Sequence, residues 1–175
     1  MELTAKKWGL LAGMSALAGV LVVAIIGTKR IMNAMKVSNK GLNLIKEFEG
    51  LRTTAYQDSV GVWTIGYGHT SGVKKGQTIT AAQADEYLRK DIEKVEKQIA
   101  LLGMNLNQNQ LDAVASFVFN LGYGKLLSST LLKKMRVNVN DKTIAEEFKR
   151  WVYAGGIKLQ GLARRRAAEA QLYFS

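Results

Sequence analysis

Residues 47–70, EFEGLRTTAYQDSVGVWTIGYGHT, determine how the folded part of this chain begins. An apolar pattern with helical spacing starts at Ser38 and ends at Gly50. Tyr56, a glycine-containing turn and a β-favouring run that ends at Ile65 come after it. The stretch therefore predicts a helix that gives way to a small antiparallel hairpin.

Helical patterns dominate the rest of the chain. Thr80 and Gln83 fit a capping box at the start of one helix, and the run NQNQLDAVASFVFNLGYG predicts a largely buried helix that ends at Gly122. The pattern as a whole predicts an α+β fold that is mostly helical, with one small antiparallel β-sheet near its start. Shorter helices are expected over residues 129–135, 144–153 and 162–173.

The composition limits the kinds of site that the chain can form. Its 175 residues suit one globular domain besides an apolar N-terminal run, and 25 Lys and Arg against 14 Asp and Glu give a net charge of +11. A basic protein favours polyanions, but no arginine-rich block, zinc-finger spacing or aromatic platform indicates nucleic acid. With no cysteine and one histidine, we expect no cofactor, no metal site and no control by thiol exchange.

Residues 8–27, WGLLAGMSALAGVLVVAIIG, contain no charged side chain and would span about 30 Å as a helix, enough to cross a bilayer. Four glycines, four alanines and a serine dilute the strongly apolar side chains, so the predicted membrane helix is held weakly and is able to leave the bilayer. A cleaved signal peptide and a buried core helix are the weaker alternatives. We therefore expect a membrane segment over 1–28, a tether over 29–37 and a globular domain over 38–175.

The charges that flank this apolar run conflict with the function inferred below. Two lysines precede the run, and four basic residues follow it before residue 41. The positive-inside rule would then keep the globular domain in the cytoplasm. Gly9 and Gly13 match the G-x-x-x-G pattern of closely packed membrane helices, so a tethered dimer stays open as an expectation.

The carboxylates around the end of the first predicted helix differ in their expected surroundings. Glu49 lies at the margin of the apolar stripe, whereas Glu47 points away from it. Partial burial favours the protonated form of a carboxyl, as a general acid requires. Asp58, in a polar turn with free backbone amides, is expected to stay ionised. Such a pair suits the acid and base roles of glycoside hydrolysis, although aspartates at turns and glutamates at helix ends are common without any catalytic role.

Several motifs occur together in the order that is typical of one enzyme family. Glu49, Asp58 and Thr64 reproduce the spacing E-x8-D-x5-T, and TIGYGHT at 64–70 matches T-x-G-x-G-H. Over roughly residues 38–175 the chain resembles the phage lysozymes of glycoside hydrolase family 24, the T-even type. With its lysine-flanked, Gly- and Ala-rich N-terminus it resembles the signal-anchor-release (SAR) endolysins. The other matching blocks are FVFNLG at 117–122, WVYAGG at 151–156 and GLARRRAAE at 161–169.

The resemblance implies a lysozyme-like fold and a role for each matching residue. Glu49 would be the general acid that protonates the glycosidic oxygen, and Asp58 would direct the attacking water or stabilise the oxocarbenium-like transition state. Thr64 would help to hold that water. By residue type alone, a phenylalanine in this pattern fits the core and strand glycines fit a bulge. The positions expected to bind substrate by resemblance are Gly66, Gly68, Phe119, Asn120 and Thr130.

The single histidine, His69, is expected to be structural. Asp91 falls beside apolar residues of its predicted helix and needs a partner there, and the family pattern pairs it with His69. We therefore expect an ion pair between sheet and helix. Arg165 is expected to pair with Glu49 or Glu169, whereas its two arginine neighbours are expected at the surface.

The resemblance implies a phage endolysin: a muramidase that hydrolyses the β-1,4 linkage between N-acetylmuramic acid and N-acetylglucosamine in peptidoglycan and so lyses the host cell. Its expected partners are peptidoglycan and the bacterial inner membrane, with the catalytic domain on the periplasmic side and then released to the periplasm as a monomer. A lytic transglycosylase, which needs only the glutamate, is one alternative. A non-catalytic, basic wall-binding or membrane-disrupting protein is the other.

Overall fold

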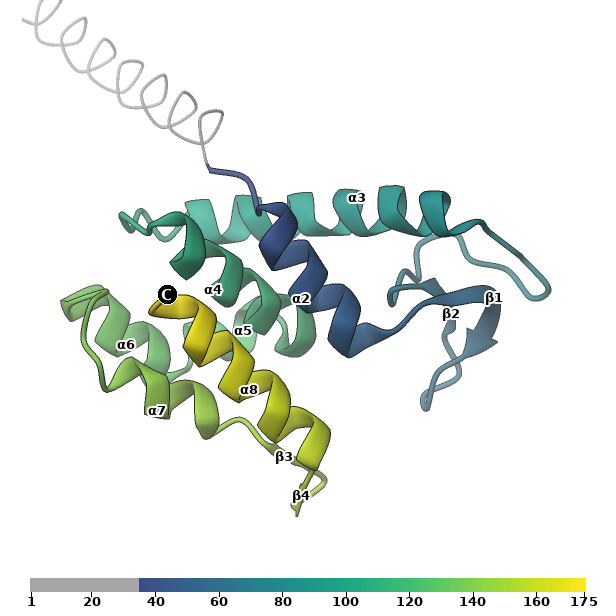
Figure 1. Cartoon of the computed structure of the whole chain (residues 1–175). Helices are drawn as coiled ribbons and strands as arrows, with labels where there is room; N and C mark the ends of the chain where they lie inside the picture. The colour runs from purple at the N-terminus through teal and green to yellow at the C-terminus, as the bar shows by residue number, and fades with distance from the viewer. Residues whose placement is uncertain (1–34) are drawn as a thin grey trace, which may run out of the picture. The chain divides into compact units, whose positions relative to one another are not determined.

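The computed structural model describes residues 35–175, from Met35 to the C-terminus (Figure 1). The predicted membrane segment at 1–28, and the predicted tether up to residue 34, lie outside the described residues. Within 35–175, no helix has the length and apolar character needed to cross a membrane. The described part of the chain forms one compact unit.

The first helix and the first hairpin form as the sequence predicts. α2, Asn39–Glu49, begins where the Ser38 hydroxyl accepts hydrogen bonds from two backbone amides of the first turn. It ends at Gly50, whose φ of 70° suits glycine. β1, Arg52–Gln57, then pairs antiparallel with β2, Trp63–Gly66. The chain therefore reverses direction directly after α2, which places the hairpin beside the helix end (Figure 1).

Six further helices follow within the described residues. α3 and α4 both start with a capping box, which Thr80 and Gln83 form for α3 as predicted, and α4 ends at Gly122 as predicted. The short helix α5 comes directly after α4 and was not predicted. The bounds are α3 Ala81–Ala100, α4 Gln108–Leu121, α5 Tyr123–Leu127, α6 Thr130–Val137, α7 Ile144–Lys149 and α8 Gln160–Tyr173.

A second hairpin corrects two sequence predictions. The helix expected over 144–153 ends already at Lys149, and β3, Tyr153–Ala154, pairs antiparallel with β4, Ile157–Lys158. The turn between them is Gly155 and Gly156, with φ values of 57° and 79°, a conformation that two adjacent glycines adopt without strain. The described residues therefore contain two two-stranded sheets and not the single one that was expected.

α4 is the central helix of the larger hydrophobic core. Its residues from 110 to 118 are all buried, and it packs against α2, α3 and α8. α2 approaches closely because it presents Gly41: a Cβ atom at this position would lie only 2.8 Å from the Cβ of Asp112. The buried glycine thus fixes how near the helix that ends at Glu49 lies to the core.

α3 joins this core to a smaller one beneath the first hairpin. Its first turns supply Ala84 to the small cluster, in which Ile65 of β2 and Ile79 also lie. Its later turns supply Leu88 and Ile92 to the large cluster. A single rigid helix of 20 residues therefore packs against both the hairpin and the helical part (Figure 1).

The folded unit begins earlier than the predicted boundary at residue 38. Val37 is buried, and its amide donates to Glu96 Oε1 of α3 at 2.7 Å. Lys36 Nζ lies 2.9 Å from the other oxygen of the same carboxylate, and this contact raises the pKa of the lysine. Lys36 and Val37 belong to the folded unit because α3 supplies a carboxylate that binds both of them.

Candidate active site

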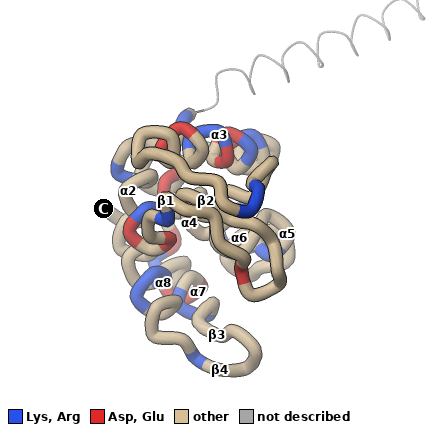
Figure 2. The backbone as a smooth tube through the Cα atoms, turned by 90° about the vertical axis from the view of Figure 1, so that its right-hand side faces the viewer, with Lys and Arg blue, Asp and Glu red and all other residues tan. Residues whose placement is uncertain are grey.

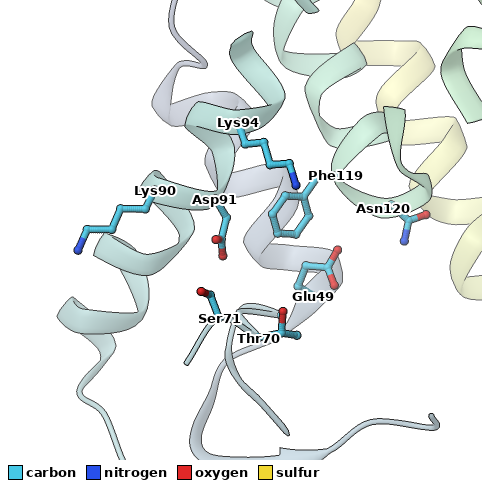
Figure 3. A pocket seen from close by; sticks show the side chains of 9 residues that line it. Glu49, Thr70, Ser71, Lys90, Asp91, Lys94, Phe119 and Asn120 are labelled. Atoms are coloured by element: carbon cyan, nitrogen blue, oxygen red, sulfur yellow. The ribbon is translucent and has the colours of Figure 1, made fainter. Parts of the chain in front are cut away.

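Glu49, the last residue of α2, lies at an open cavity of about 650 Å³ that α2, α3, α4 and the loop after β2 surround (Figure 3). Gly50 ends the helix there and turns the chain toward β1. The Glu49 side chain is 23% exposed, so it is partly desolvated, as the sequence predicts. The residues that line the cavity are Glu49, Gly68, Thr70, Ser71, Lys90, Asp91, Lys94, Phe119 and Asn120.

Arg165 of α8 holds the Glu49 carboxylate from the protein side. Its Nη1 donates to Glu49 Oε1 at 2.6 Å, and its side chain is only 3% exposed. The other oxygen, Glu49 Oε2, lies 4.0 Å from the point that a Cβ atom on Gly68 would occupy. Gly68 has a φ of 95°, which favours glycine. One oxygen of Glu49 is therefore held by a buried cation, and the other faces the loop after β2 with no hydrogen-bond partner from residues 35–175.

A buried group of polar side chains supports Arg165 from behind. Glu169 Oε1 accepts from the Ser116 hydroxyl at 2.7 Å, from Arg166 Nη2 at 2.8 Å and from Arg165 Nε at 3.3 Å. Burial raises the pKa of the Glu169 carboxyl and lowers the pKa of the Arg166 guanidinium, because each charged form loses its hydration. The prediction that Arg165 pairs with a glutamate is confirmed for both candidates. The prediction that Arg166 is a surface residue is wrong, since its side chain is fully buried.

The same group of side chains orients Asn120. Arg166 Nη2 donates to Asn120 Oδ1 at 3.1 Å, which leaves the amide nitrogen of Asn120 as a free donor at the cavity (Figure 3). Phe119, the preceding residue, adds part of an aromatic ring to the same wall. An amide donor beside an apolar ring is suited to bind a sugar, which carries both hydroxyls and C–H faces.

Asp58 and Thr64 are both tied to one residue of the first hairpin, Val62. The Val62 amide donates to Asp58 Oδ1 at 2.8 Å, and the Val62 carbonyl accepts from the Asp58 amide at 3.0 Å. The same carbonyl accepts from the Thr64 hydroxyl at 3.1 Å. The Val60 amide also donates to Asp58 Oδ1, at 3.0 Å. These bonds orient the carboxylate and leave its Oδ2 without a hydrogen bond from residues 35–175.

The cavity brings together part of the predicted site. Asp58 and Thr64 belong to the adjacent hairpin and do not line this cavity. Gly66 is buried: a Cβ atom on it would lie 3.3 Å from the Cβ of Ala84, so this glycine allows β2 to pack against α3. The predicted site residues that line the cavity are Glu49, Gly68, Asp91, Phe119 and Asn120.

Thr130, which was expected to bind substrate, has a partner elsewhere. It is the first residue of α6, and its hydroxyl donates to Glu147 Oε2 of α7 at 2.6 Å. The hydrogen bonds from Lys134 and then from Thr130 lower the pKa of the Glu147 carboxyl. Thr130 does not line the cavity at Glu49, and its hydrogen bond to Glu147 joins α6 to α7.

Four cavity residues were not expected from the sequence: Thr70, Ser71, Lys90 and Lys94. They could have been indicated by their closeness in sequence to residues already predicted for the site. Thr70 and Ser71 directly follow the T-x-G-x-G-H block, and the two lysines lie one position before and three positions after Asp91, on one face of α3.

His69 contacts Asp91, which lines the cavity. Its Nδ1 lies 2.8 Å from Asp91 Oδ2, and its Nε2 lies 3.0 Å from the Ser71 carbonyl oxygen. The ring also stacks on Tyr87 with centroids 4.5 Å apart. The contact joins the loop after β2 to α3. That its role is structural stays a prediction.

Two carboxylates, one partly buried at a helix end beside an open cavity and one on the neighbouring hairpin, fit the hydrolysis of a glycosidic bond. Together with the mostly helical, lysozyme-like fold they define a glycoside hydrolase of the lysozyme class. The family model of phage lysozyme matches residues 46–169, and the chain belongs to the phage lysozyme family.

Relatives and solved structures agree with this assignment. The chain is 46% identical to an endolysin of Acyrthosiphon pisum secondary endosymbiont phage 1 over 147 residues, which cover 81% of this chain and 99% of that protein. It is 34% identical to a SAR-endolysin of bacteriophage PS34 over 154 residues, 87% of this chain and 90% of that protein. The muramidase domain of SpmX from Asticaccaulis excentricus has a similar structure, with a TM-score of 0.73 and 40% identity over 80% of this chain and 98% of that domain.

The His69–Asp91 contact generates a stability prediction. Replacing either residue by asparagine removes a charge-assisted hydrogen bond between two partly buried side chains, which are 12% and 31% exposed. We expect each variant to lose about 1–3 kcal/mol of unfolding free energy near pH 7 and to retain part of its wall-clearing activity. Thermal unfolding followed by circular dichroism, with a turbidity assay, measures both effects.

Asp85→Asn is the matched control for this prediction. Asp85 lies on the same helix and pairs with Lys46 at 2.6 Å, but its side chain is 50% exposed. An exposed pair contributes about 0–1 kcal/mol, so this variant should melt close to the unmodified protein. If neither His69→Asn nor Asp91→Asn melts lower than the control, the structural role is refuted.

Proposed function

We propose that this protein is a phage endolysin that hydrolyses the β-1,4 linkage between N-acetylmuramic acid and N-acetylglucosamine in peptidoglycan. Glu49 acts as the general acid, and Asp58 and Thr64 act on the attacking water. The observation that carries the proposal is the Glu49 side chain, which is only 23% exposed, lies at the wall of an open cavity and is held on one carboxyl oxygen by Arg165.

The two oxygens of Glu49 have different roles in this mechanism. Oε1 accepts from Arg165 at 2.6 Å, so Oε2 is the oxygen that carries the proton to the glycosidic oxygen of the leaving sugar. When the proton leaves, negative charge develops on the carboxylate, and the guanidinium at Oε1 stabilises it. Arg165 therefore supports proton donation as the glycosidic bond breaks, without touching the sugar.

Asp58 and Thr64 would orient one water molecule. The Thr64 hydroxyl hydrogen is directed to the Val62 carbonyl, so the oxygen accepts one hydrogen of the water. Asp58 Oδ1 is occupied by two amides, so Oδ2 accepts the other hydrogen. The water oxygen then attacks the anomeric carbon while Asp58 takes up its proton. A water between the carboxyls requires a separation of about 6.5–9.5 Å, the arrangement of an inverting enzyme.

Glu49→Gln tests the assignment of the general acid. Glutamine keeps an oxygen for Arg165 but cannot deliver a proton, so wall clearing should fall by about 10²–10⁴-fold. The variant should remain folded by circular dichroism. The matched control is Glu47→Gln, on the same helix at an exposed position, which should clear walls at the unmodified rate. Full bacteriolysis by Glu49→Gln would instead indicate a wall-binding or membrane-disrupting protein.

Asp58→Asn separates hydrolysis from transglycosylation. The asparagine Oδ1 preserves both bonds from the backbone amides, so the turn should stay intact, but the variant lacks a base for the water. We expect a loss of about 10²–10⁴-fold in rate. Mass spectrometry of the products of the unmodified protein should show reducing ends. Substantial activity in Asp58→Asn together with 1,6-anhydro ends would establish a lytic transglycosylase.

We further propose that the chain is first tethered to the inner membrane with its catalytic domain in the periplasm and is later released. Two observations support this: the charge-free, Gly- and Ala-rich run at 8–27, and the relationship to a SAR-endolysin over 87% of the chain. The weak apolarity of the run makes release thermodynamically accessible. The distribution of flanking charges argues for the opposite orientation, so the topology needs a direct test.

Fractionation of cells that express the full-length chain provides that test. Before depolarisation we expect the protein in the membrane fraction, with its globular part degraded by protease added to spheroplasts. After depolarisation it should appear in the soluble periplasmic fraction. A variant with Gly13 and Gly19 replaced by leucine should stay in the membrane, because each change makes the run more apolar. Protection from external protease would place the domain in the cytoplasm and overturn the proposal.

A further inference from the structure

Glu169 is a completely buried glutamate of α8 that the mechanism above does not use. Its side chain has no exposed surface, and one of its oxygens, Oε1, accepts three hydrogen bonds. The donors are the Ser116 hydroxyl at 2.7 Å, Arg166 Nη2 at 2.8 Å and Arg165 Nε at 3.3 Å. The two buried guanidinium groups therefore share one carboxyl oxygen, and one of these two groups also binds Glu49.

The contacts of Glu169 favour its ionised form. Burial raises the pKa of the carboxyl, while the charge of Arg166 and the hydrogen bond from Ser116 act against this rise. All three donors point to Oε1 and two of them are cationic, so a carboxylate satisfies them best. A proton on Oε2 would be a buried donor without an acceptor among residues 35–175. Glu169 is therefore a buried negative charge.

The buried group as a whole carries one net positive charge. Arg165 and Arg166 contribute one positive charge each, and Glu169 contributes one negative charge. Without Glu169, two positive charges would act on Glu49, which lies 2.6 Å from Arg165 Nη1. Charges that are withdrawn from water interact strongly over several ångströms, so this difference reaches the Glu49 carboxyl.

Glu49 places two opposite requirements on its surroundings. As the proposed general acid, it has to keep its proton until the glycosidic oxygen takes it. A positive charge beside a carboxyl stabilises the ionised form, which has no proton to donate. Arg165 positions the carboxyl and at the same time favours its ionisation. A negative charge bound to the same guanidinium reduces the second effect and keeps the first.

The neighbouring charged groups on α2 and α4 have other partners or face solvent. On α2, Lys46 is paired with Asp85 at 2.6 Å, and Glu47 is exposed. On α4, Asp112 accepts from the Ser38 amide at 2.9 Å. A partner or solvent screens each of these charges, so they act on the buried group only weakly.

α3 brings three charged side chains to the cavity of Glu49. Lys90 and Lys94 are exposed, and Asp91 contacts His69 at 2.8 Å. Solvent screens the charges of exposed side chains far more than those of buried ones. Among the described residues, the strongest electrostatic influence on Glu49 therefore comes from α8.

We propose that Glu169 is a positioning residue that sets the pH range of catalysis: its buried charge offsets one guanidinium, so that Arg165 holds Glu49 without depriving it of its proton. The inference rests on the proposed function, because it assigns to Glu169 an effect on the proposed general acid. Glu169 does not line the cavity and acts only through Arg165.

The test is the pH profile of kcat for hydrolysis of soluble, uncrosslinked peptidoglycan. In the proposed mechanism the alkaline limb reports loss of the Glu49 proton, and the acid limb reports protonation of Asp58. Glu169→Gln keeps the size of the side chain and an oxygen for its three donors but removes the charge. The alkaline limb should move to lower pH by about 1 pH unit, so the rate above the limb falls about tenfold. The acid limb should stay, because Asp58 belongs to the first hairpin.

Arg166→Met tests the same charge balance in the opposite direction. Methionine is a flexible apolar side chain that suits a buried position, and the change removes one positive charge. The alkaline limb should therefore move to higher pH by a similar amount, while KM rises because Asn120 loses its partner. The double variant Arg166→Met/Glu169→Gln again carries one net positive charge, so its alkaline limb should return to that of the unmodified protein. A purely structural role would not produce shifts of opposite sign.

Glu147→Gln is the matched control. Glu147 is another buried glutamate, 5% exposed, on α7, which lies beside α8 (Figure 2). Its carboxylate binds Thr130, Lys134 and Arg150, which lie outside the cavity of Glu49. The variant removes the same charge from a buried site and should melt lower, but it should keep both limbs of the profile. Circular dichroism verifies the fold of every variant.

The outcomes distinguish the two proposals. If the unmodified protein cleaves peptidoglycan at no pH, the proposed muramidase function is wrong. If it cleaves but Glu169→Gln and Arg166→Met leave the alkaline limb in place, or move it in the same direction, the role of Glu169 is refuted and the muramidase function stands. If Glu147→Gln moves the limb as far as Glu169→Gln does, the effect belongs to net charge and the role is again refuted. Where one of the two variants fails to fold, the direction of the shift in the other decides.

Discussion

The contact between Arg165 and Glu49 is the interaction on which the candidate site depends, because it ties α8 to the end of α2. Behind it, Glu169 and Arg166 are fully buried, and burying charged groups is costly even when they are paired. Within the described residues, three atoms of this group, Arg166 Nε and Nη1 and Glu169 Oε2, are buried without a partner. An apolar cluster of similar volume would give comparable or greater stability. The group is therefore better explained by position than by stability: it places one guanidinium on one oxygen of Glu49 and one on the amide of Asn120.

A second, independent constraint positions the other candidate residues. Val62 bonds to Asp58 through both its amide and its carbonyl, and the same carbonyl accepts from Thr64. The two side chains therefore move together with the hairpin and cannot be displaced separately. The hairpin reaches the helical part through β2 and α3, where the buried glycine Gly66 permits close packing. Glu49 is thus fixed by ionic contacts within the helical part, while Asp58 is fixed by backbone hydrogen bonds within the hairpin.

The sequence predicted those parts of the molecule that depend on local chemistry. The N-cap at Ser38, the end of α2 at Gly50 and the capping box of α3 all act within a few residues, and all are present. The second hairpin was missed although Gly155 and Gly156 are a recognised turn signal, because strands of two residues are too short to show alternation. Arg166 was misplaced for a different reason. Three consecutive arginines look solvated. The partners that allow two of them to be buried, Ser116 and Asn120, lie on α4, and the sequence predicted this helix but not its packing against α8.

The candidate site also has some residues that local sequence predicts and others that only long-range packing brings together. The spacing of Glu49, Asp58 and Thr64 can be read from the chain because one helix end and one hairpin carry all three residues. The wall opposite Glu49 cannot be predicted from the sequence, because α3 and α4 reach the cavity only through the packing of the two hydrophobic clusters. α3 belongs to both clusters, so it sets the orientation of the hairpin relative to the helices. The same helix carries Asp91 toward His69 and Lys94 toward the cavity (Figure 3). The position of the hairpin beside the helices and the side chains along the α3 wall of the cavity are therefore two consequences of how one helix packs.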